Sequence, residues 1–265
     1  MMERMPTEFT LEEVLKGKAT SIKGKDYLPT RGYIEPFLER VQKLTSDIRV
    51  HVKLPDQITY NKNGDIDTAD LTFNRVWLEA VLPNEYQYAN HQQVIGMVYG
   101  LDTRKAVVKM YSGALNSACT NLCVFNPDSL VVNEIEPETP VNFKPITRLV
   151  EQTTEIGVTL RRFADTDFDY TNKSFVNEHL GRWVRNCMSE SIDNGFGKVK
   201  LATSTPIDAY KLLFDKKDSP YLISDDNANM FTVYNAFTQI ITDSMKKDIM
   251  NQVEKTLLVN SILTL

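Results

Sequence analysis

A chain of 265 residues with 42% apolar and 25% charged residues has enough mass for a proper core, as one large domain or two small ones. Its net charge of -5 argues against a protein coated in nucleic acid but leaves room for a local basic groove. The polar start, the three cysteines and the lack of an apolar run near the ~20 residues of a membrane span predict a cytoplasmic protein without a membrane anchor.

The first 35 residues include the most basic stretch of the chain. Thr10-Leu-Glu-Glu13 is a capping box, so a short helix is predicted to begin there and to close at Gly17. The glycines and Pro29 that follow favour an irregular segment over a packed element. We therefore expect residues 1–35 to form a basic N-terminal arm with one short helix.

Residues 36–143 carry the signals of a mainly antiparallel β region. Pro36 stands where a helix can begin, and the alternating apolar residues of 48–54 then predict a strand. The Asn63-Gly64 turn predicts a hairpin between two further strands, at 57–60 and 71–82.

The centre of the predicted sheet is a long, buried hairpin. Two β-branched and aromatic runs, 94–99 and 106–111, flank a turn at Gly100–Arg104. Over 117–125, small or apolar residues alternate with Cys119, Asn121 and Cys123, which predicts a third strand.

From residue 144 onward the periodicity becomes helical. Pro145, Ser174 and Pro206 can each begin or cap a helix, and a longer helical region spans roughly 227–262. Strands followed by helices predict an α+β fold, in which residues 144–265 pack as helices on one face of the antiparallel sheet and share its core. The loop Asn194–Lys198 between two helices could offer backbone N–H groups and a lysine to an anion.

The residues indicate no catalytic site. His51, His91 and His179 lack the local context of a catalytic triad. Cys119 and Cys123 lack the second pair that a tetrahedral zinc site needs. We expect a protein without a cofactor, and a binding protein in preference to an enzyme.

Two acidic segments leave a metal-binding alternative open. Thr59–Asp70 resembles a calcium loop in spacing, but its first and last residues are not the Asp and Glu that such a loop uses. Asp165, Asp167 and Asp169 could gather around magnesium, yet Tyr170 stands where a calcium loop needs Gly. A hairpin turn and a polar connection explain both segments without a metal, so no metal site is predicted.

The basic arm is the best candidate for a binding surface. Lysines neutralise phosphates, and tyrosines can stack on unpaired bases. Basic residues on the central hairpin and on the first of the later helices could extend the same surface. The predicted DNA-binding residues are Lys16, Lys18, Lys23, Lys25, Tyr27, Arg31, Tyr33, Arg104, Lys105, Lys109, Arg161 and Arg162.

Two short motifs resemble a family of phage and plasmid proteins known only as a domain of unknown function. Its members carry a Cys-Thr-Asn or Cys-Ser-Asn triplet at a strand, here Cys119-Thr120-Asn121, and an Asn-Ala-x-Thr helix, here Asn235–Thr238. The family follows the triplet with Gly, where this chain has Leu122. The resemblance covers roughly residues 92–245 and implies a mobile-element origin rather than an activity.

Three functions follow from these observations. The order of strands before helices is similar to that of phage single-strand annealing proteins, which implies a homo-oligomer that binds single-stranded DNA and promotes recombination without nucleotide hydrolysis, in the cytoplasm of an infected bacterium. The second is a non-enzymatic phage structural or host-interaction (anti-defence) protein. The third is a metal-dependent nuclease or hydrolase that uses Asp165, Asp167 and Asp169.

Overall fold

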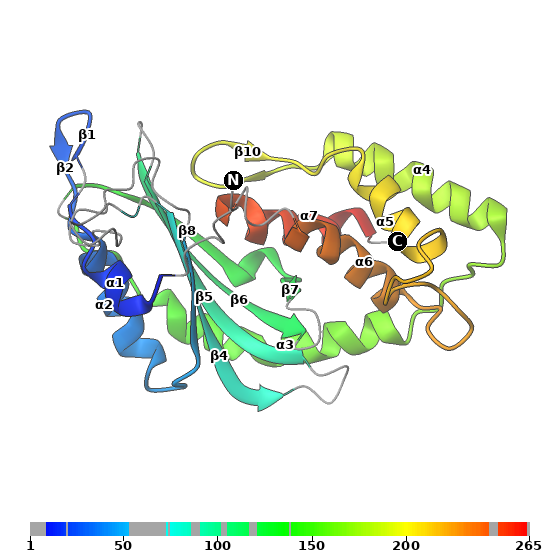
Figure 1. The fold of residues 1–265 in the computed structure, drawn as a ribbon, viewed down its shortest axis with the longest axis horizontal. Helices are drawn as coiled ribbons and strands as arrows, with labels where there is room; N and C mark the ends of the chain where they lie inside the picture. The colour runs from blue at the N-terminus through cyan, green and yellow to red at the C-terminus, as the bar shows by residue number, and fades with distance from the viewer. Residues whose placement is uncertain are drawn as a thin grey trace, which may run out of the picture.

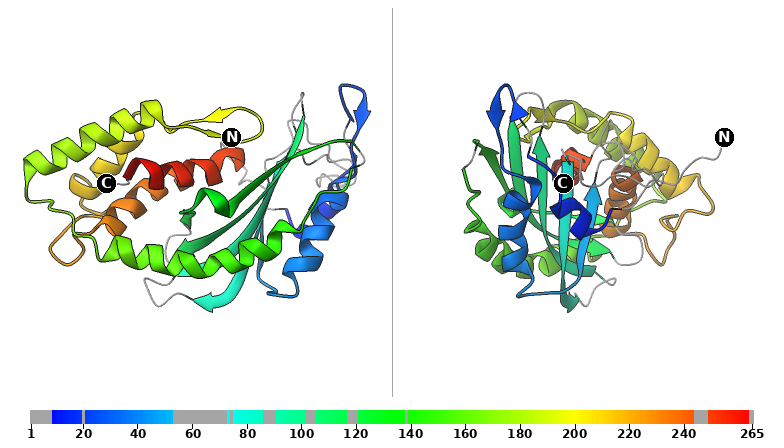
Figure 2. Two further views of the ribbon diagram at one scale, coloured as in Figure 1. Left: turned by 180° about the vertical axis from the view of Figure 1, so that it is seen from behind. Right: turned by 60° about the vertical axis from the view of Figure 1, so that its left-hand side comes forward.

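The computed structural model describes residues 9–19, 21–52, 73, 75–85, 91–101, 105–116, 121–137, 139–243 and 249–263. These residues build a six-stranded antiparallel sheet with helices on both sides of it (Figures 1 and 2). The α+β class and the long central hairpin are thereby confirmed. The strands of the sheet are β3 (Ile48–Val52), β4 (Arg75–Glu85), β5 (His91–Leu101), β6 (Ala106–Asn116), β7 (Leu122–Cys123) and β8 (Leu130–Ile135).

The sheet is centred on the β5–β6 hairpin. β3, β4, β5 and β6 are neighbours in that order, and β6 then pairs with β8 along one half and with β7 along the other. In the β5–β6 ladder, Val98 lies opposite Lys109 and Gly96 opposite Tyr111. Every described side chain of β6 is buried, because both faces of the sheet are covered.

One face of the sheet packs against the N-terminal helices. Its apolar cluster joins side chains of β4, β5 and β6, such as Leu78 and Met97, to α1, α2 and the first half of α3. The expectation placed the later helices on one face; the cover supplied by α1 and α2 on this face was not expected. These helices are α1 (Leu11–Leu15), α2 (Thr30–Val41) and α3 (Pro145–Ala164).

The other face of the sheet packs against the C-terminal helices. Trp77, Val98 and Tyr111 form a cluster there with side chains of η3 and α7. The Tyr111 hydroxyl donates a hydrogen bond to Glu79 Oε1 at 2.9 Å and accepts one from Trp77 Nε1 at 2.5 Å. The remaining elements are η2 (Pro127–Ser129), α4 (Lys173–Ser189), β9 (Ile192–Asp193), β10 (Lys198–Val199), α5 (Thr205–Phe214), α6 (Met230–Asp243), η3 (Ile249–Asn251) and α7 (Gln252–Leu263).

The N-terminal stretch is packed, where the sequence predicted an irregular arm. α1 and its capping box are confirmed, but a small hairpin follows, β1 (Ser21–Ile22) and β2 (Lys25–Asp26), and α2 begins at Thr30 with Pro36 inside it. The glycine pattern was misleading at Gly17. A Cβ there would lie 2.7 Å from the Thr30 hydroxyl and 2.9 Å from the Phe73 ring, so this glycine permits close packing.

Most later elements agree with their predictions. β3, α3, α4 and α5 form where expected, and the long helical region divides into α6 and α7. The third strand is limited to β7 in the described residues, and β8 was not predicted. The Asn63-Gly64 turn and the Thr59–Asp70 loop lie outside the described residues.

Candidate functional site

The β1–β2 hairpin presents two exposed lysines of the basic stretch. Lys23 and Gly24 have φ of 51° and 73°, the pair of positive angles that a two-residue type I′ turn requires. Ile22 anchors the hairpin in the core, while Lys23 and Lys25 are exposed. Neither lysine pairs with an acid among the residues that the structure describes. Figure 1 shows this hairpin projecting at one end of the molecule.

The other cations of this stretch are exposed and partly neutralised. Lys16 Nζ lies 3.0 Å from Glu12 Oε1, and Arg31 Nε lies 3.9 Å from Glu35 Oε2. Lys18 is exposed as well. Exposed pairs one helical turn apart contribute only about 0.3–0.5 kcal/mol, so a phosphate could displace them.

Tyr27 and Tyr33 are buried, which corrects their predicted role as stacking platforms. The Tyr33 ring stacks on Tyr99 with centroids 5.0 Å apart, and its hydroxyl accepts a hydrogen bond from the Leu28 N–H at 3.1 Å. Burial raises the pKa of Tyr33. Both rings hold the N-terminal stretch on the sheet and present no open face to a base.

The central hairpin divides its predicted basic residues. Lys105 is half-buried and forms an ion pair with Glu134 at 2.5 Å near the tip. Arg104 lies outside the described residues. Lys109 is fully buried and is therefore removed from the predicted DNA-binding surface.

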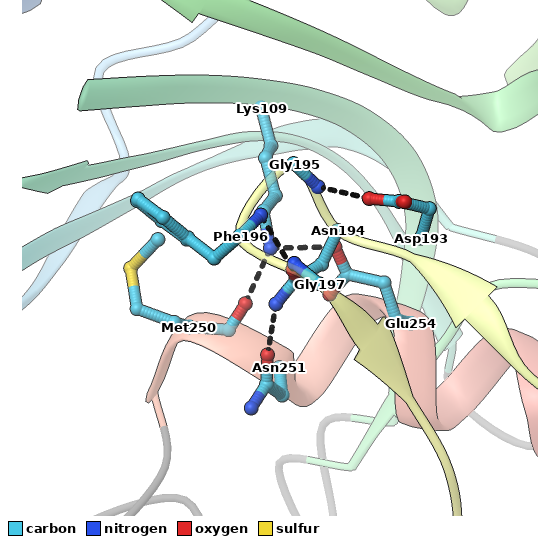
Figure 3. A network of polar contacts seen from close by, with 9 residues as sticks. All are labelled: Lys109, Asp193, Asn194, Gly195, Phe196, Gly197, Met250, Asn251 and Glu254. Carbon is cyan, nitrogen blue, oxygen red and sulfur yellow. Dashed lines mark hydrogen bonds and ion pairs between the residues drawn. The ribbon is translucent and has the colours of Figure 1, made fainter. Parts of the chain in front are cut away.

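The buried Lys109 joins the sheet to the C-terminal helices (Figure 3). Its Nζ lies 2.5 Å from Glu254 Oε1 and donates a hydrogen bond to the Met250 carbonyl at 2.6 Å. Both side chains have 0% exposure. Such a pair specifies how α7 docks on β6, because misalignment would leave two buried charges apart. Val107 and Tyr111, which share the face of Lys109 in β6, are apolar, so the sequence held a signal that this face is buried.

The β9–β10 turn was considered as an anion site, and its N–H groups are already bonded. Asn194 Oδ1 accepts hydrogen bonds from the N–H groups of Phe196 and Gly197 at 2.8 and 2.9 Å. Asp193 Oδ1 accepts from the Gly195 N–H at 2.8 Å, and the Asn194 side chain also donates to Asn251 Oδ1. This turn therefore acts as a structural contact beside the Lys109 pair, as Figure 3 shows.

The two arginines of α3 are exposed but lie apart from the N-terminal hairpin. Arg161 and Arg162 stand near the end of α3 that reaches the C-terminal helices (Figures 1 and 2). The Arg162 guanidinium lies 5.8 Å from the centroid of the Phe163 ring. The structure thus does not join them to the β1–β2 hairpin in one continuous surface.

The described histidines and carboxylates do not assemble into a reactive site. His91 packs against Phe231, and His179 Nδ1 lies 2.9 Å from the Phe175 carbonyl inside the core. Asp169 Oδ1 accepts a hydrogen bond from the Asn172 N–H, which joins it to the start of α4. Across the described parts of the chain, no three metal-ligating side chains gather around one point.

The two family-like motifs meet in a buried polar contact. Asn121 Nδ2 donates hydrogen bonds to the Tyr221 hydroxyl at 3.2 Å and to the Asn235 carbonyl at 3.4 Å. Thr238 Oγ1 donates to the same carbonyl at 3.1 Å. All four residues are at least 90% buried. The motifs therefore fix β7 against α6, and Cys119 and Thr120 lie outside the described residues.

Comparison with known proteins adds no family. No family model, no curated protein and no solved structure matches this chain at a significant level. Within the residues that the structure describes, none of the helices has the length and apolarity that crossing a membrane needs. Function must therefore be argued from the molecule itself.

Proposed function

We propose that this protein binds DNA without enzymatic activity, through phosphate contacts made by the projecting β1–β2 hairpin. The observation that carries the proposal is the pair of exposed lysines at its tip, Lys23 and Lys25, which no described acid neutralises. Lys16, Lys18 and Arg31 would add contacts once the phosphate displaces Glu12 and Glu35.

The number of contacts sets the affinity that one protomer can reach. Neutralising two phosphates of a single strand gives a log–log salt slope of about -1.4, and neutralising five gives about -3.5. Either value means weak binding by one protomer. An oligomer that places several hairpins along one strand multiplies the affinity, so the proposal includes the homo-oligomer that single-strand annealing would need.

The burial of Tyr27 and Tyr33 removes the expected basis for a preference for single-stranded DNA. Stacking on aromatic rings is the usual source of preference for single strands, and neither ring is accessible. The contacts are therefore to the backbone and do not depend on base sequence. Annealing of complementary strands by a phage protein is the finer part of the proposal. The order of strands before helices supports annealing by analogy, and the motif resemblance bears only on a phage origin.

Fluorescence anisotropy with labelled single-stranded DNA, at low and moderate salt, tests the proposal alongside mass photometry. The test variant is Lys23→Asn with Lys25→Gln, because Asn tolerates the positive φ of position 23 and preserves the turn. We expect salt-sensitive binding by an oligomer and at least tenfold weaker binding by the variant. Equal binding by both proteins, or none at low salt, would refute the proposal.

A second candidate is a phage structural or host-interaction protein. The observation in its favour is that several exposed cations lie beside acids, as in the pairs Lys16–Glu12, Arg31–Glu35 and Arg148–Asp128. A surface of alternating charge suits a protein partner. A stable assembly that shows no salt-dependent DNA binding would favour this candidate.

A further inference from the structure

A small cleft lies between α3, the η2 turn and α7, with a volume of about 200 Å³. One wall is a stripe of α3 at helical spacing that includes Glu155, Ile156 and Arg162. The opposite wall includes Phe125 and Asn260, and Asn260 Nδ2 donates a hydrogen bond to the Phe125 carbonyl at 2.6 Å. This hydrogen bond joins α7 to the chain before η2 and so holds the wall formed by Phe125 and Asn260 in place.

The cleft carries opposite charges that do not neutralise one another. Glu155 and Arg162 are both exposed, and neither forms an ion pair with a described residue. They stand seven residues apart on α3, which is about 10 Å of helix rise. The cleft therefore offers an acceptor near one end and a cation near the other.

Amide side chains and an aromatic ring complete the lining. Asn126 and Gln152 line the cleft together with the edge of the buried Phe125. Asn126 Oδ1 accepts a hydrogen bond from the Asp128 N–H at 2.9 Å, which holds the Asn126 side chain in place. Amides beside an aromatic ring are the groups with which proteins read the edge of an unpaired base.

The size and charge of the cleft select one ligand class. A free amino acid has its ammonium and carboxylate on one carbon, too close together to reach both charges. A nucleotide separates its phosphate from the amine of its base by a ribose. A volume of about 200 Å³ holds a single-ring base or a purine, so the exocyclic amine, and not the size of the base, decides which nucleotides suit Glu155. Carboxylates accept from the exocyclic amine of cytosine, and arginine binds phosphate with two parallel hydrogen bonds.

We propose that this cleft binds a nucleotide whose base carries an exocyclic amine, such as a cytidine nucleotide, with the phosphate on Arg162 and the amine of the base on Glu155. The site lies away from the β1–β2 hairpin and is independent of the DNA-binding proposal. The shared chemistry is that of a free nucleotide or of one residue within a single strand. Arg162 was predicted from the sequence as a phosphate contact, and in this proposal Glu155 contacts the base of the same nucleotide.

Chemical-shift titration of the ¹⁵N-labelled full-length chain tests this site. With dCMP we expect shifts on α3, η2 and the end of α7, and with dTMP about tenfold weaker binding because thymine lacks the amine. Arg162→Ala should weaken dCMP binding at least tenfold, whereas Arg161→Ala, a matched exposed arginine next to it, should change it less than twofold. Glu155→Ala should make dCMP and dTMP equal.

The other outcomes of this titration also test the proposal. Shifts of the same size and affinity with inorganic phosphate alone would overturn the proposal, as would equal binding of dCMP and dTMP by the unmodified protein. Equal damage by Arg161→Ala and Arg162→Ala would overturn it too. Tighter binding of a short oligo(dC) than of dCMP, lost in Arg162→Ala but kept in the hairpin variant, would identify a strand as the source. Tightest binding of free dCMP would identify the nucleotide.

Discussion

The buried ion pair between Lys109 and Glu254 makes the sharpest prediction about this fold. At 2.5 Å the attraction between the two charges is about 7 kcal/mol for an effective dielectric constant of about 20. Most of that attraction offsets the cost of removing both charges from water. Lys109→Met leaves Glu254 as a buried, uncompensated charge, so we expect it to lower the free energy of unfolding by about 3–5 kcal/mol.

The double variant Lys109→Met with Glu254→Leu should recover most of this loss. It removes both charges and leaves the Met250 carbonyl as an unmet acceptor, which costs about 1–3 kcal/mol when buried. We therefore expect the double variant to lie within about 2 kcal/mol of the unmodified protein. Urea denaturation followed by circular dichroism measures the stability of Lys109→Met, Glu254→Leu and the double variant. The double-mutant cycle built from these variants yields the coupling energy between the two side chains.

The chain contains a matched control for this experiment. Lys105 and Glu134 are the same 2.5 Å apart, but their side chains are 35% and 64% exposed instead of 0%. Lys105→Met should cost less than about 1 kcal/mol. The reasoning is refuted if the two lysine variants cost the same, or if the double variant loses the sum of its two single losses.

Three further predictions concern the core. A Cβ at Gly96 would lie 2.0 Å from the Tyr111 ring, so Gly96→Ala should displace that ring and cost about 2–4 kcal/mol in urea denaturation. A Cβ at Gly181 on α4 would make only an ordinary contact, 3.5 Å from the Arg185 guanidinium, so Gly181→Ala should stabilise the helix by up to about 1 kcal/mol. Burial raises the pKa of the Cys187 thiol to about 11, so at pH 8 a thiol reagent should modify it at least about 100-fold more slowly in the folded than in the urea-unfolded protein, and equal rates would contradict its burial. Burial also raises the pKa of three tyrosines well above the ordinary value. Their contribution to the free energy of unfolding is complete below about pH 10 and is lost as the pH rises further, because the unfolded chain then binds fewer protons than the folded one. In alkaline denaturation we expect the free energy of unfolding to fall by up to about 4 kcal/mol per pH unit. These tyrosines are Tyr99, Tyr111 and Tyr234.

Periodicity predicted the elements better than it predicted which side chains they bury. The β5–β6 hairpin followed from its β-branched runs, and α3 followed from Pro145 and the apolar stripe behind it. Lys109 has the same neighbours in sequence whether its strand face meets solvent or α7. The apolar residues Val107 and Tyr111 on the same face favoured burial, but the partner that compensates the charge, Glu254, is 145 residues further along the chain and no local pattern could reveal it.

The basic stretch failed as a predicted arm for a related reason. Local composition registered its lysines and glycines but not the partners that bury Tyr27 and Tyr33. Tyr99, which stacks on Tyr33, belongs to the sheet and is 66 residues away. What remains as a candidate surface is the exposed turn of the β1–β2 hairpin.

The meeting of the two motifs changes what their resemblance can mean. Asn121 and Asn235 were considered together only because a family of phage and plasmid proteins carries two similar motifs. In this structure the Asn121 side chain donates a hydrogen bond to the Asn235 carbonyl. A buried asparagine that joins a strand to a helix is constrained by packing, whatever the protein binds. Shared motifs of this kind support a shared way of docking α6 on β7 more directly than a shared activity. In the two proposals, function resides in exposed groups that this docking leaves accessible, the hairpin lysines and the charged cleft beside α3.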